Sequence, residues 1–416
     1  MHAEVVAKAE KAREAAAILA AVPTEAKNRA LRLIAEALKA QSGKIMEANA
    51  RDLKLYRESA GFTRALEDRL MLNEERIAGA AGGLLEIAAL EDPVGEVTGA
   101  SLRPSGLQVG QVRTPIGVVG IIYEARPNVT VDAAGLTLKS GNAVILRGGS
   151  EALNSNMCLV GIIQEQLRRA ELPVASVQLI EDSDRAAART LMRLNGSVDL
   201  LIPRGGPSLI KAVIENATVP VIETGAGNCH LYIDKSAAKD MAVEIALNAK
   251  VQRPGVCNAI ETLLVHQAAA EEILPAALTK LEQAGVELRG CPRTRSYHKT
   301  VKEASEEDWG REYLDLILAV RVVDSIDEAI AHISRYGTMH SEAIVTADYG
   351  RARLFLSRVD AAAVYVNAST RFTDGSEFGL GAEMGISTQK LHVRGPMGLK
   401  ALTSLKYIVY GSGQVR

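Results

Sequence analysis

Cys257 has the local sequence of a nucleophilic cysteine. It follows a Pro-Gly pair in the segment QRPGVCN (residues 252–258), which also holds Arg253. The acid Glu223 lies upstream, in the glycine-broken segment ETGAGN. The thiolate is the attacking form of cysteine, and cationic neighbours favour it. Free cysteines are also among the most buried residue types, so a packed thiol is the alternative interpretation. The segment therefore indicates thiolate chemistry, provided that the rest of the chain supports it.

Two further segments have residues suited to binding phosphate. Each places an arginine and two glycines between an apolar run and a helical pattern: Arg147-Gly148-Gly149-Ser150 and Arg204-Gly205-Gly206. Ligands of open parallel sheets bind at the carboxyl ends of strands. Glycine-exposed amides at a helix N-terminus favour phosphate, and arginine adds a bidentate donor. The alternative is that Gly-Gly merely closes a tight turn. Because we expect both turns on neighbouring elements of one sheet, they predict a phosphate-bearing cofactor, although no GxGxxG fingerprint accompanies them.

The elements that must position these residues follow a regular alternation. Residues 1 to about 90 predict helices, because Ala, Glu, Lys and Leu dominate and apolar residues recur at helical spacing. From residue 117, short Val/Ile/Leu runs alternate with helical patterns, which indicates buried parallel strands in a doubly wound α/β sheet. A second alternating series begins near Cys229, so we expect a new α/β domain from residues 225–228 onward. Residues 402–410 predict a lone terminal strand.

Composition excludes several classes of protein. A chain of 416 residues predicts two or three domains, and 47% hydrophobic with 24% charged residues is ordinary for a globular protein. The net charge of -2 argues against a dedicated nucleic-acid binder. We find neither an apolar stretch of about 18 residues nor the pattern of a signal peptide. The four cysteines are far apart and lack a CxxC pair, which fits reduced thiols in a cytoplasmic protein without a metal site.

Longer motifs resemble those of the aldehyde dehydrogenase superfamily over nearly the full chain. They are DPVG (92–95), PIGVVGIIYEARPNVT (115–130), KSGN (139–142), ETGAGNCH (223–230), QRPGVCN (252–258) and FGLGAEMGIS (378–387). Two of them, 123–130 and 252–258, are specific to the branch that reduces L-glutamyl 5-phosphate in proline biosynthesis. The resemblance implies an α/β fold with a Rossmann-type cofactor domain, an α/β catalytic domain and a small β element for oligomerisation. The implied domains are an NADP-binding domain at 1–225 with oligomerisation strands at 95–112, a catalytic domain at 226–395 and an oligomerisation strand at 396–416.

The resemblance also implies catalytic roles. Cys257 matches the catalytic cysteine, and Glu223 matches the superfamily's acid. That acid activates water in hydrolytic relatives, whereas release of phosphate needs no water, so Glu223 is equally suited to a structural role. Asn128 is the nearest side-chain amide to the expected oxyanion position, although its register is offset. Its alternative role is the N-cap of the following helix.

Binding residues follow from the same resemblance. NADPH or NADP would contact Arg147, Gly148, Gly149, Ser150, Arg204, Gly205, Gly206 and Glu312. Arg147 replaces a lysine found in many relatives and would face the 2′-phosphate. Glu312 would hold the nicotinamide ribose, although its local Glu-Tyr-Leu-Asp departs from the usual Glu-x-Phe-Gly-Pro. The substrate would contact Arg126, Arg253, Ser369, Thr370 and Arg371, and the alternative for each arginine is an ordinary surface position.

The reaction implied by the resemblance is reduction of L-glutamyl 5-phosphate to L-glutamate 5-semialdehyde and phosphate through a thioester on Cys257. A homo-oligomer, a dimer or tetramer, is expected, and glutamate 5-kinase is a candidate partner. Two alternatives differ in chemistry. One is a branch that acts on free aldehydes or coenzyme A thioesters, against which the 123–130 segment argues. The other is a catalytically silent scaffold for glutamate 5-kinase, in which Cys257 would be inert.

Overall fold

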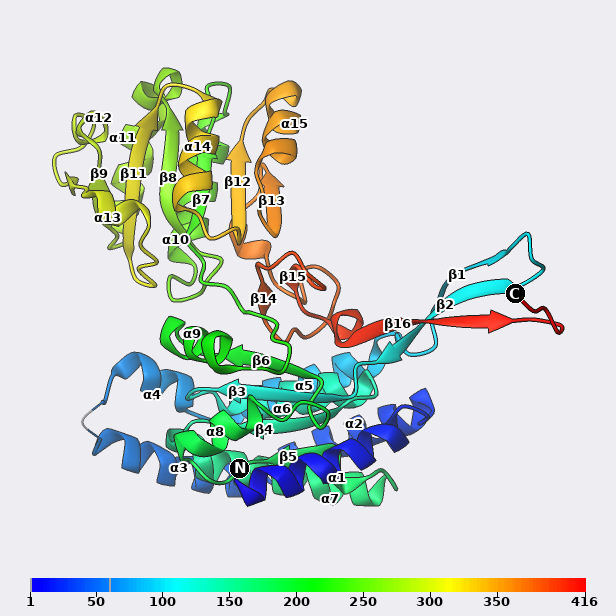
Figure 1. Ribbon diagram of the computed structural model, residues 1–416. Coiled ribbons are helices and arrows are strands. Elements are labelled where there is room, and N and C mark those ends of the chain that lie inside the picture. The colour runs from blue at the N-terminus through cyan, green and yellow to red at the C-terminus, as the bar shows by residue number, and fades with distance from the viewer. Residues whose placement is uncertain (1, 60) are drawn as a thin grey trace. The chain divides into compact units, whose positions relative to one another are not determined.

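The chain folds into two compact units in a computed structural model that describes residues 2–59 and 61–416. The first unit comprises Met1–Thr224, Gly379–Gly385 and Met397–Arg416, and the second comprises Gly225–Phe378 and Ile386–Pro396 (Figure 1). The chain first passes from one unit to the other between Thr224 and Gly225. Both units combine helices with parallel strands, so the predicted α/β class is confirmed.

Helices occupy the first part of the chain, as its composition predicts. They are α1 (Ala3–Leu19), α2 (Thr24–Ala40), α3 (Ser42–Arg57), α4 (Arg64–Leu70) and α5 (Glu74–Ala89). On α2, Leu31, Ile34 and Leu38 recur at helical spacing and are buried, which fixes the face that packs inward. The side chains of Thr63 and Asn73 accept backbone hydrogen bonds at the starts of α4 and α5, so polar caps set where these helices begin.

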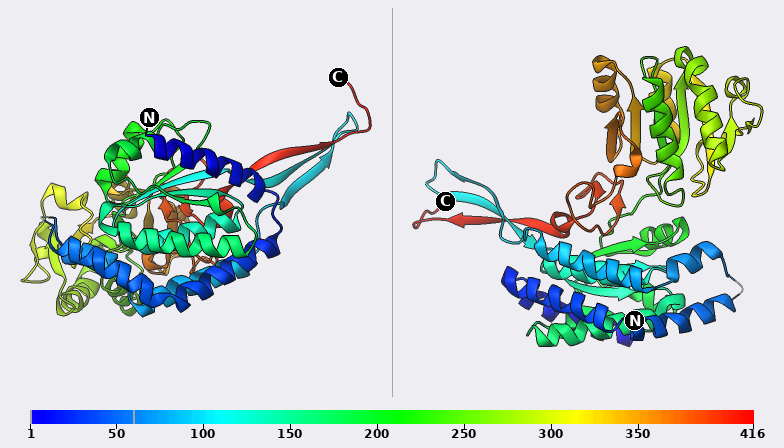
Figure 2. Two further views of the ribbon diagram at one scale, coloured as in Figure 1. Left: turned by 90° about the horizontal axis from the view of Figure 1, so that it is seen from below. Right: turned by 180° about the vertical axis from the view of Figure 1, so that it is seen from behind.

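A four-stranded parallel sheet forms the centre of the first unit, in the order β5-β4-β3-β6. Its strands are β3 (Val118–Tyr123), β4 (Ala143–Arg147), β5 (Val177–Leu179) and β6 (Leu200–Arg204). The connecting helices are α6 (Pro127–Lys139), α7 (Leu153–Arg169), α8 (Arg185–Leu191) and α9 (Pro207–Asn216), with 3-10 turns η1 (Ser150–Ala152) and η2 (Val174–Ser176). Helices cover both faces, with α1 and α8 opposite α6 and α7 (Figure 2). Burial on both faces explains the continuous apolar runs.

The order of the strands corrects one expectation. The two Arg-Gly-Gly turns follow β4 and β6, and β3 lies between these strands. The turns therefore share one sheet edge but are not on neighbouring strands. The reason is the doubly wound topology, in which the chain reverses direction across the sheet after β5 and returns to the other side of β3.

The second unit is built on a seven-stranded parallel sheet in the order β10-β9-β11-β8-β7-β12-β13. Its strands are β7 (Cys229–Ile233), β8 (Ile260–His266), β9 (Glu287–Gly290), β10 (Lys302–Glu303), β11 (Ile317–Val323), β12 (Ser341–Val345) and β13 (Ala363–Val366). Its helices are α10 (Lys239–Val251), α11 (Gln267–Gln283), α12 (Pro292–Arg295), α13 (Glu306–Trp309), α14 (Ile326–Tyr336) and α15 (Tyr349–Arg358). The 3-10 turn η3 (Thr370–Phe372) follows β13, and a small antiparallel ribbon joins β14 (Ile386–Ser387) to β15 (Gly395–Pro396).

A three-stranded antiparallel sheet projects from the first unit (Figures 1 and 2). It consists of β1 (Val97–Leu102), β2 (Gln108–Pro115) and β16 (Thr403–Tyr410), which follows the 3-10 turn η4 (Leu399–Leu402). The prediction of a lone terminal strand was wrong, because β16 pairs with β2 along its whole length. No neighbour in sequence revealed this partner, since β2 lies almost 300 residues away (|i−j| = 290 for the Thr114–Ser404 contact). Within the described chain, the outer edges of β1 and β16 carry no further strand.

Among residues 2–59 and 61–416, none of the helices combines the length and the apolar character needed to cross a bilayer.

Candidate active site

Cys257 lies in the loop between α10 and β8 of the second unit, at the amino end of β8. Its side chain is half-buried, whereas Gln252 and Arg253 earlier in the loop are exposed. The buried thiol of Cys229 donates a 3.1 Å hydrogen bond to the Cys257 carbonyl. Burial raises the pKa of Cys229 well above its usual value, so Cys229 is unsuited to attack. Of these two neighbouring thiols, Cys257 is the one with partial access to solvent.

The backbone of Gly227 packs directly against the Cys257 peptide. A Cβ at position 227 would stand 1.5 Å from the Cys257 carbonyl oxygen and 2.6 Å from its Cα, so only glycine fits. The Gly227 amide donates a 2.7 Å hydrogen bond to Oε1 of Glu312. Burial raises the pKa of the Glu312 carboxyl, and this hydrogen bond opposes the rise. Glu312 thus holds the segment that packs against Cys257, and its contact with a ribose stays a prediction.

Arg371 connects the predicted substrate segment to the loop of residues 252–259, which carries Cys257 and is called the nucleophile loop below after the predicted role of that residue. Its guanidinium donates to Oδ1 of Asn258 and, at 2.9 Å, to Oε1 of Gln252. The Thr370 hydroxyl donates a 2.6 Å bond to the Asn258 carbonyl. The Ser369 hydroxyl accepts the Arg371 amide at 3.3 Å, which starts the η3 turn. The structure therefore brings three predicted substrate residues to the loop that carries Cys257.

The charge of Arg371 interacts with that of Cys257. Burial lowers the pKa of Arg371, and the nearby charge of Arg253 lowers it further. Interaction with Cys257 and Asp374 acts in the opposite direction. Because charge interactions are mutual, the Arg371 guanidinium favours a thiolate at Cys257. Binding of an anionic substrate by Arg253 and Arg371 stays a prediction.

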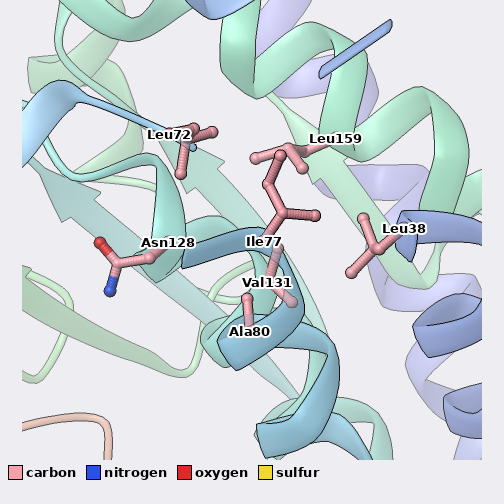
Figure 3. Close-up of a pocket in the computed structure, with 7 residues that line it drawn as sticks. All are labelled: Leu38, Leu72, Ile77, Ala80, Asn128, Val131 and Leu159. Atoms are coloured by element: carbon pink, nitrogen blue, oxygen red, sulfur yellow. The ribbon is translucent and has the colours of Figure 1, made fainter. Parts of the chain in front are cut away.

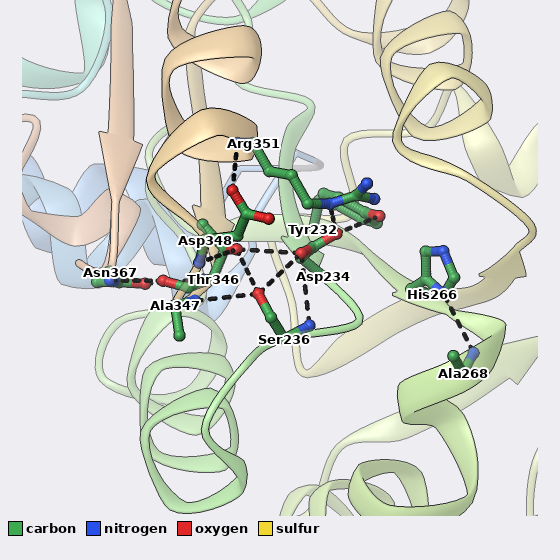
Figure 4. Close-up of polar contacts among 10 residues, drawn as sticks. All are labelled: Tyr232, Asp234, Ser236, His266, Ala268, Thr346, Ala347, Asp348, Arg351 and Asn367. Carbon is green, nitrogen blue, oxygen red and sulfur yellow. Dashed lines mark hydrogen bonds and ion pairs between the residues drawn. The ribbon is translucent and has the colours of Figure 1, made fainter.

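A second polar network fixes the chain just before the Ser369–Arg371 segment. Asp234, directly after β7, accepts hydrogen bonds from Arg351 at 2.6 Å and from Thr346 at 3.0 Å (Figure 4). Burial alone would raise the pKa of Asp234, but these hydrogen bonds hold it below the usual range. The Asn367 side chain accepts a 2.9 Å hydrogen bond from the backbone amide of Thr346 and donates one of 2.9 Å to the Thr346 carbonyl. The backbone of Asn367 adopts a left-handed conformation with φ 56°. The network thereby sets the direction in which the substrate segment leaves β13.

The first Arg-Gly-Gly turn is shaped by close packing in the first unit. A Cβ at Gly148 would lie 2.3 Å from Nδ2 of Asn156 and 3.2 Å from the Tyr123 ring, so this position requires glycine. Arg147 donates hydrogen bonds to the carbonyls of Ser183 at 2.6 Å and Gly148 at 3.1 Å. Burial lowers the pKa of Arg147, and nearby carboxylates oppose this. The guanidinium is thus held at the carboxyl end of β4, with Gly149 and the exposed Ser150 next in the chain.

A carboxylate of the protein itself contacts the second turn. The Gly206 amide, at the N-terminus of α9, donates a 2.8 Å bond to Oε2 of Glu124. Unpaired amides at a helix N-terminus attract anionic oxygen, and here Glu124 supplies it. Gly205 lies against the same carboxylate, and the Arg204 guanidinium packs on Gly385. In this structure the Gly206 amide is therefore paired with a carboxylate of the chain itself, and phosphate binding at this turn stays a prediction.

Asn128 differs from its expected local role. The N-cap of α6 is Arg126 and Pro127 is the first helical residue, so Asn128 lies inside the helix and the N-cap interpretation was wrong. A proline is favoured at this first position because its missing N–H has no helical partner there. The Asn128 amide donates a 3.3 Å bond to Asp132, whose pKa burial raises to about 6.

Asn128 also lies on the rim of a small apolar pocket. The pocket is lined by Leu38, Leu72, Ile77, Ala80, Asn128, Val131 and Leu159 (Figure 3). The amide group of Asn128 points away from the apolar side chains. The pocket therefore gives no polar partner to Asn128, and the oxyanion role stays a prediction.

The predicted site residues divide between the two units. Cys257, Glu312, Arg253, Ser369, Thr370 and Arg371 belong to the second unit, and Asn128, Glu223, Arg126 and both Arg-Gly-Gly turns belong to the first. Glu223 is partly buried and lies two residues before the second unit begins. Sequence reasoning did not single out Glu124 or the buried pair Lys250 and Glu261. The available signal for Glu261 was an acid inside an otherwise apolar strand pattern, and for Glu124 it was an acid directly after an apolar run.

Comparisons with known proteins agree with these features. A sequence model of the aldehyde dehydrogenase family matches residues 1–290. A gamma-glutamyl phosphate reductase of Moorella thermoacetica is 62% identical over 413 residues, 99% of each chain. The protein of the same name from Caldanaerobacter subterraneus is 59% identical, covering 99% of this chain and 100% of the relative. The crystal structure of gamma-glutamyl phosphate reductase from Thermotoga maritima has a TM-score of 0.96 at 52% identity, covering 99% of this chain and 100% of that one.

Gly227→Ala tests whether the Gly227 contact holds Cys257 in place. The added methyl group cannot fit beside the Cys257 carbonyl, so we expect the loop to shift at a cost of about 1–3 kcal/mol or more in unfolding free energy. Alkylation of Cys257 by iodoacetamide, followed by peptide mass spectrometry, should slow strongly. Gly161→Ala on α7 is the control, because no atom lies within 4 Å of the added carbon. This control should stabilise the helix by about 0.5–1 kcal/mol and leave alkylation unchanged. Alkylation of Gly227→Ala at the wild-type rate would show that the contact is unimportant.

Proposed function

The chain belongs to the aldehyde dehydrogenase family and, within it, to the gamma-glutamyl phosphate reductases. From this premise we propose that it uses NADPH to reduce L-glutamyl 5-phosphate to L-glutamate 5-semialdehyde and phosphate. This reaction is a step of proline biosynthesis. The observation that carries the proposal is full-length identity of 57–62% to relatives of that name, which spans both the nucleophile loop and the glycine turns. The enzyme would thus be an NADP-dependent oxidoreductase.

Cys257 is the proposed nucleophile. Its thiolate would attack the acyl carbon and expel inorganic phosphate, which leaves a thioester on the sulfur. The bound cofactor supplies the hydride that reduces this thioester. The resulting thiohemiacetal on Cys257 then collapses to the aldehyde and restores the thiol. Covalent catalysis suits this substrate, because it divides one difficult displacement into two easier steps.

The developing oxyanion needs hydrogen-bond donors. We assign the Cys257 backbone amide and the Asn128 side chain, and one such donor is typically worth about 3 kcal/mol in the transition state. Glu223 has a smaller proposed role, because phosphate is a good leaving group and no water must be activated. We therefore propose that Glu223 supports the chain locally or adjusts the protonation of Cys257.

Arginines are the proposed partners of the substrate's anionic groups. Arg253 and Arg371 lie near Cys257, and their mutual repulsion, which contributes to the lowered pKa of Arg371, would be relieved by the substrate's phosphate. Arg126, Ser369 and Thr370 complete the proposed set around the amino-acid part of the substrate. Two of these, Ser369 and Thr370, already hydrogen-bond to the backbone, so their contribution is mainly to hold the segment in place.

The glycine turns of the first unit fit a phosphate-bearing cofactor. The Gly206 amide binds an anionic oxygen from Glu124, which supports an anion-binding position at this helix N-terminus. We propose that cofactor phosphates take this position, with Arg204 and Arg147 as charged donors and Arg147 facing the 2′-phosphate of NADPH. Glu312 is the proposed partner of the nicotinamide ribose.

The reverse reaction tests the proposed function directly. NADP reduction by L-glutamate 5-semialdehyde should depend on inorganic phosphate, because phosphate must release the acyl group from Cys257. Activity with a coenzyme A thioester in place of phosphate would favour a different branch of the family. No activity in either assay, combined with an unreactive Cys257, would favour the scaffold alternative.

Cys257→Ala should abolish turnover. Removal of the sulfur eliminates the nucleophile, while a half-buried side chain this small contributes little to stability. Steady-state NADPH oxidation and an NADPH titration check both expectations. Cys158→Ala is the matched control, because Cys158 lies on α7 in the first unit. The covalent mechanism would be wrong if Cys257→Ala kept about a tenth of wild-type turnover.

Arg147→Gln and Arg204→Gln should each weaken NADPH binding. A charge-assisted contact to phosphate is worth roughly 1.5–3 kcal/mol, so the Kd should rise about tenfold or more. The larger loss should occur at the arginine that meets the 2′-phosphate, and that variant should discriminate less between NADPH and NADH. Arg168→Gln on the exposed end of α7 is the control. Unchanged Kd values for both turn variants would place the phosphates elsewhere.

Self-association is the last part of the proposal. Alternate residues of β16, namely Leu405, Tyr407 and Val409, are 44%, 69% and 54% exposed, and the outer edge of the strand is free within the described chain. Exposed apolar edge strands pair readily with another chain. We therefore propose a homo-oligomer, a dimer or tetramer, that buries this strand. Glutamate 5-kinase is a second proposed partner, and we assign no surface of this chain to it.

The double substitution Tyr407→Lys with Val409→Lys should dissociate the assembly, because two charges would have to be buried at the contact. Lys406→Ala, at the position directly before Tyr407 on the strand, is the control and should keep the assembly. Size-exclusion chromatography with light scattering gives the mass of each. An unchanged oligomer mass for the double variant would exclude β16 from the interface.

A further inference from the structure

The two ends of the nucleophile loop are joined by a buried ion pair. Lys250 is the second-last residue of α10 and Glu261 is the second residue of β8, and Nζ lies 2.5 Å from Oε2. Both side chains are 0% exposed. Removing two charges from water costs several kcal/mol each, so such a pair contributes little net stability compared with well-packed apolar residues. Stability alone therefore does not account for it.

The second oxygen of Glu261 reaches another loop of the site. Oε1 accepts the amide of Leu314 at 3.1 Å. Leu314 has φ 54°, a left-handed conformation that costs a residue other than glycine about 1 kcal/mol or more. Two residues earlier, Glu312 accepts the amide of Gly227, which packs on the Cys257 peptide. The Glu261 carboxylate thus binds Lys250, just before the nucleophile loop, and Leu314, in the loop whose Glu312 holds Gly227 against Cys257.

The surroundings make this link sensitive to charge. Burial raises the pKa of Glu261 to about 7, and the Lys250 ammonium opposes that rise. Burial also lowers the pKa of Lys250, which Glu261 and Asp315 oppose. The other groups that face the pair are Glu312 and the Tyr313 ring from the adjacent loop and Cys229 from β7. Each half of the pair therefore depends on the other to stay ionised.

We propose that Lys250 and Glu261 are positioning residues for Cys257: their ion pair fixes the ends of its loop and, through Leu314 and Glu312, presses Gly227 against the nucleophile's peptide. Neither residue needs to contact substrate for this role. The inference rests on the proposed function only in taking Cys257 as the nucleophile. It assigns a catalytic consequence to a pair that lies outside every segment singled out from the sequence.

The test is the double variant Lys250→Met with Glu261→Gln. It removes both charges with little change in volume, leaves no unpaired buried charge, and keeps a side-chain oxygen for the Leu314 amide. The matched control is Lys27→Met with Asp92→Asn, a second buried lysine–carboxylate pair, which belongs to the first unit. For each variant we would measure thermal unfolding, kcat, KM and the rate of iodoacetamide alkylation at Cys257 across the neutral pH range.

Small displacements of a reacting group have large effects on rate, so we expect kcat and the alkylation rate at Cys257 to fall about tenfold or more. KM should change much less, because the substrate contacts remain. The control should lose or gain stability without a change in alkylation. A folded double variant with wild-type alkylation and kcat would overturn the proposal.

Glu261→Asp covers the case in which the double variant does not fold. It keeps the charge but is one methylene shorter, so it cannot keep both contacts, and it should show a smaller loss of the same two rates. Unchanged rates in this variant would also overturn the proposal. If the wild type lacks phosphate-dependent activity but the variants still slow alkylation, the positioning role stands and the proposed substrate is wrong.

Discussion

The close packing of Gly227 on the Cys257 peptide is the constraint on which the rest of the second unit's site depends. A side chain at position 227 would overlap the Cys257 carbonyl, so the chain before β7 and the loop before β8 must fit each other at van der Waals contact. Glu312 holds one side of this contact, and Arg371 with Asn258 holds the loop from another. Cys257 is thus positioned by one backbone contact, and side-chain hydrogen bonds hold the segments on both sides of it.

Electrostatics gives the two units complementary tasks in the proposed reaction. The second unit places Arg371 within charge interaction of both Arg253 and Cys257, and in the proposed reaction this positive charge would favour a thiolate and an anionic substrate. In the first unit, the Gly206 amide already carries an anionic oxygen, that of Glu124. An amide that binds a carboxylate in this way is suited to exchange it for a phosphate oxygen. Under the proposed function, both units would therefore bind anionic groups.

The sequence allowed the α/β class, the first helices and the two Arg-Gly-Gly turns to be predicted, because hydrophobic periodicity and turn residues are local signals. Motif resemblance supplied Cys257 and the segment around Arg371. Three features could not be predicted: the pairing of β16 with β2, the position of β3 between the two turns, and the Lys250–Glu261 ion pair. Each depends on contacts between residues brought together by the tertiary fold, for which periodicity gives no register. The N-cap interpretation of Asn128 failed for a local reason, since Pro127 begins the helix one residue earlier.

The central claim is that Cys257 carries the acyl group during turnover, and trapping that intermediate tests it most directly. The protein would be incubated with L-glutamate 5-semialdehyde and NADP without phosphate, then quenched in acid and mapped by peptide mass spectrometry. We expect one glutamyl group on the peptide that contains Cys257, and its loss when inorganic phosphate is added before the quench. Oxidation of the semialdehyde without any adduct, or an adduct on another residue, would contradict the account.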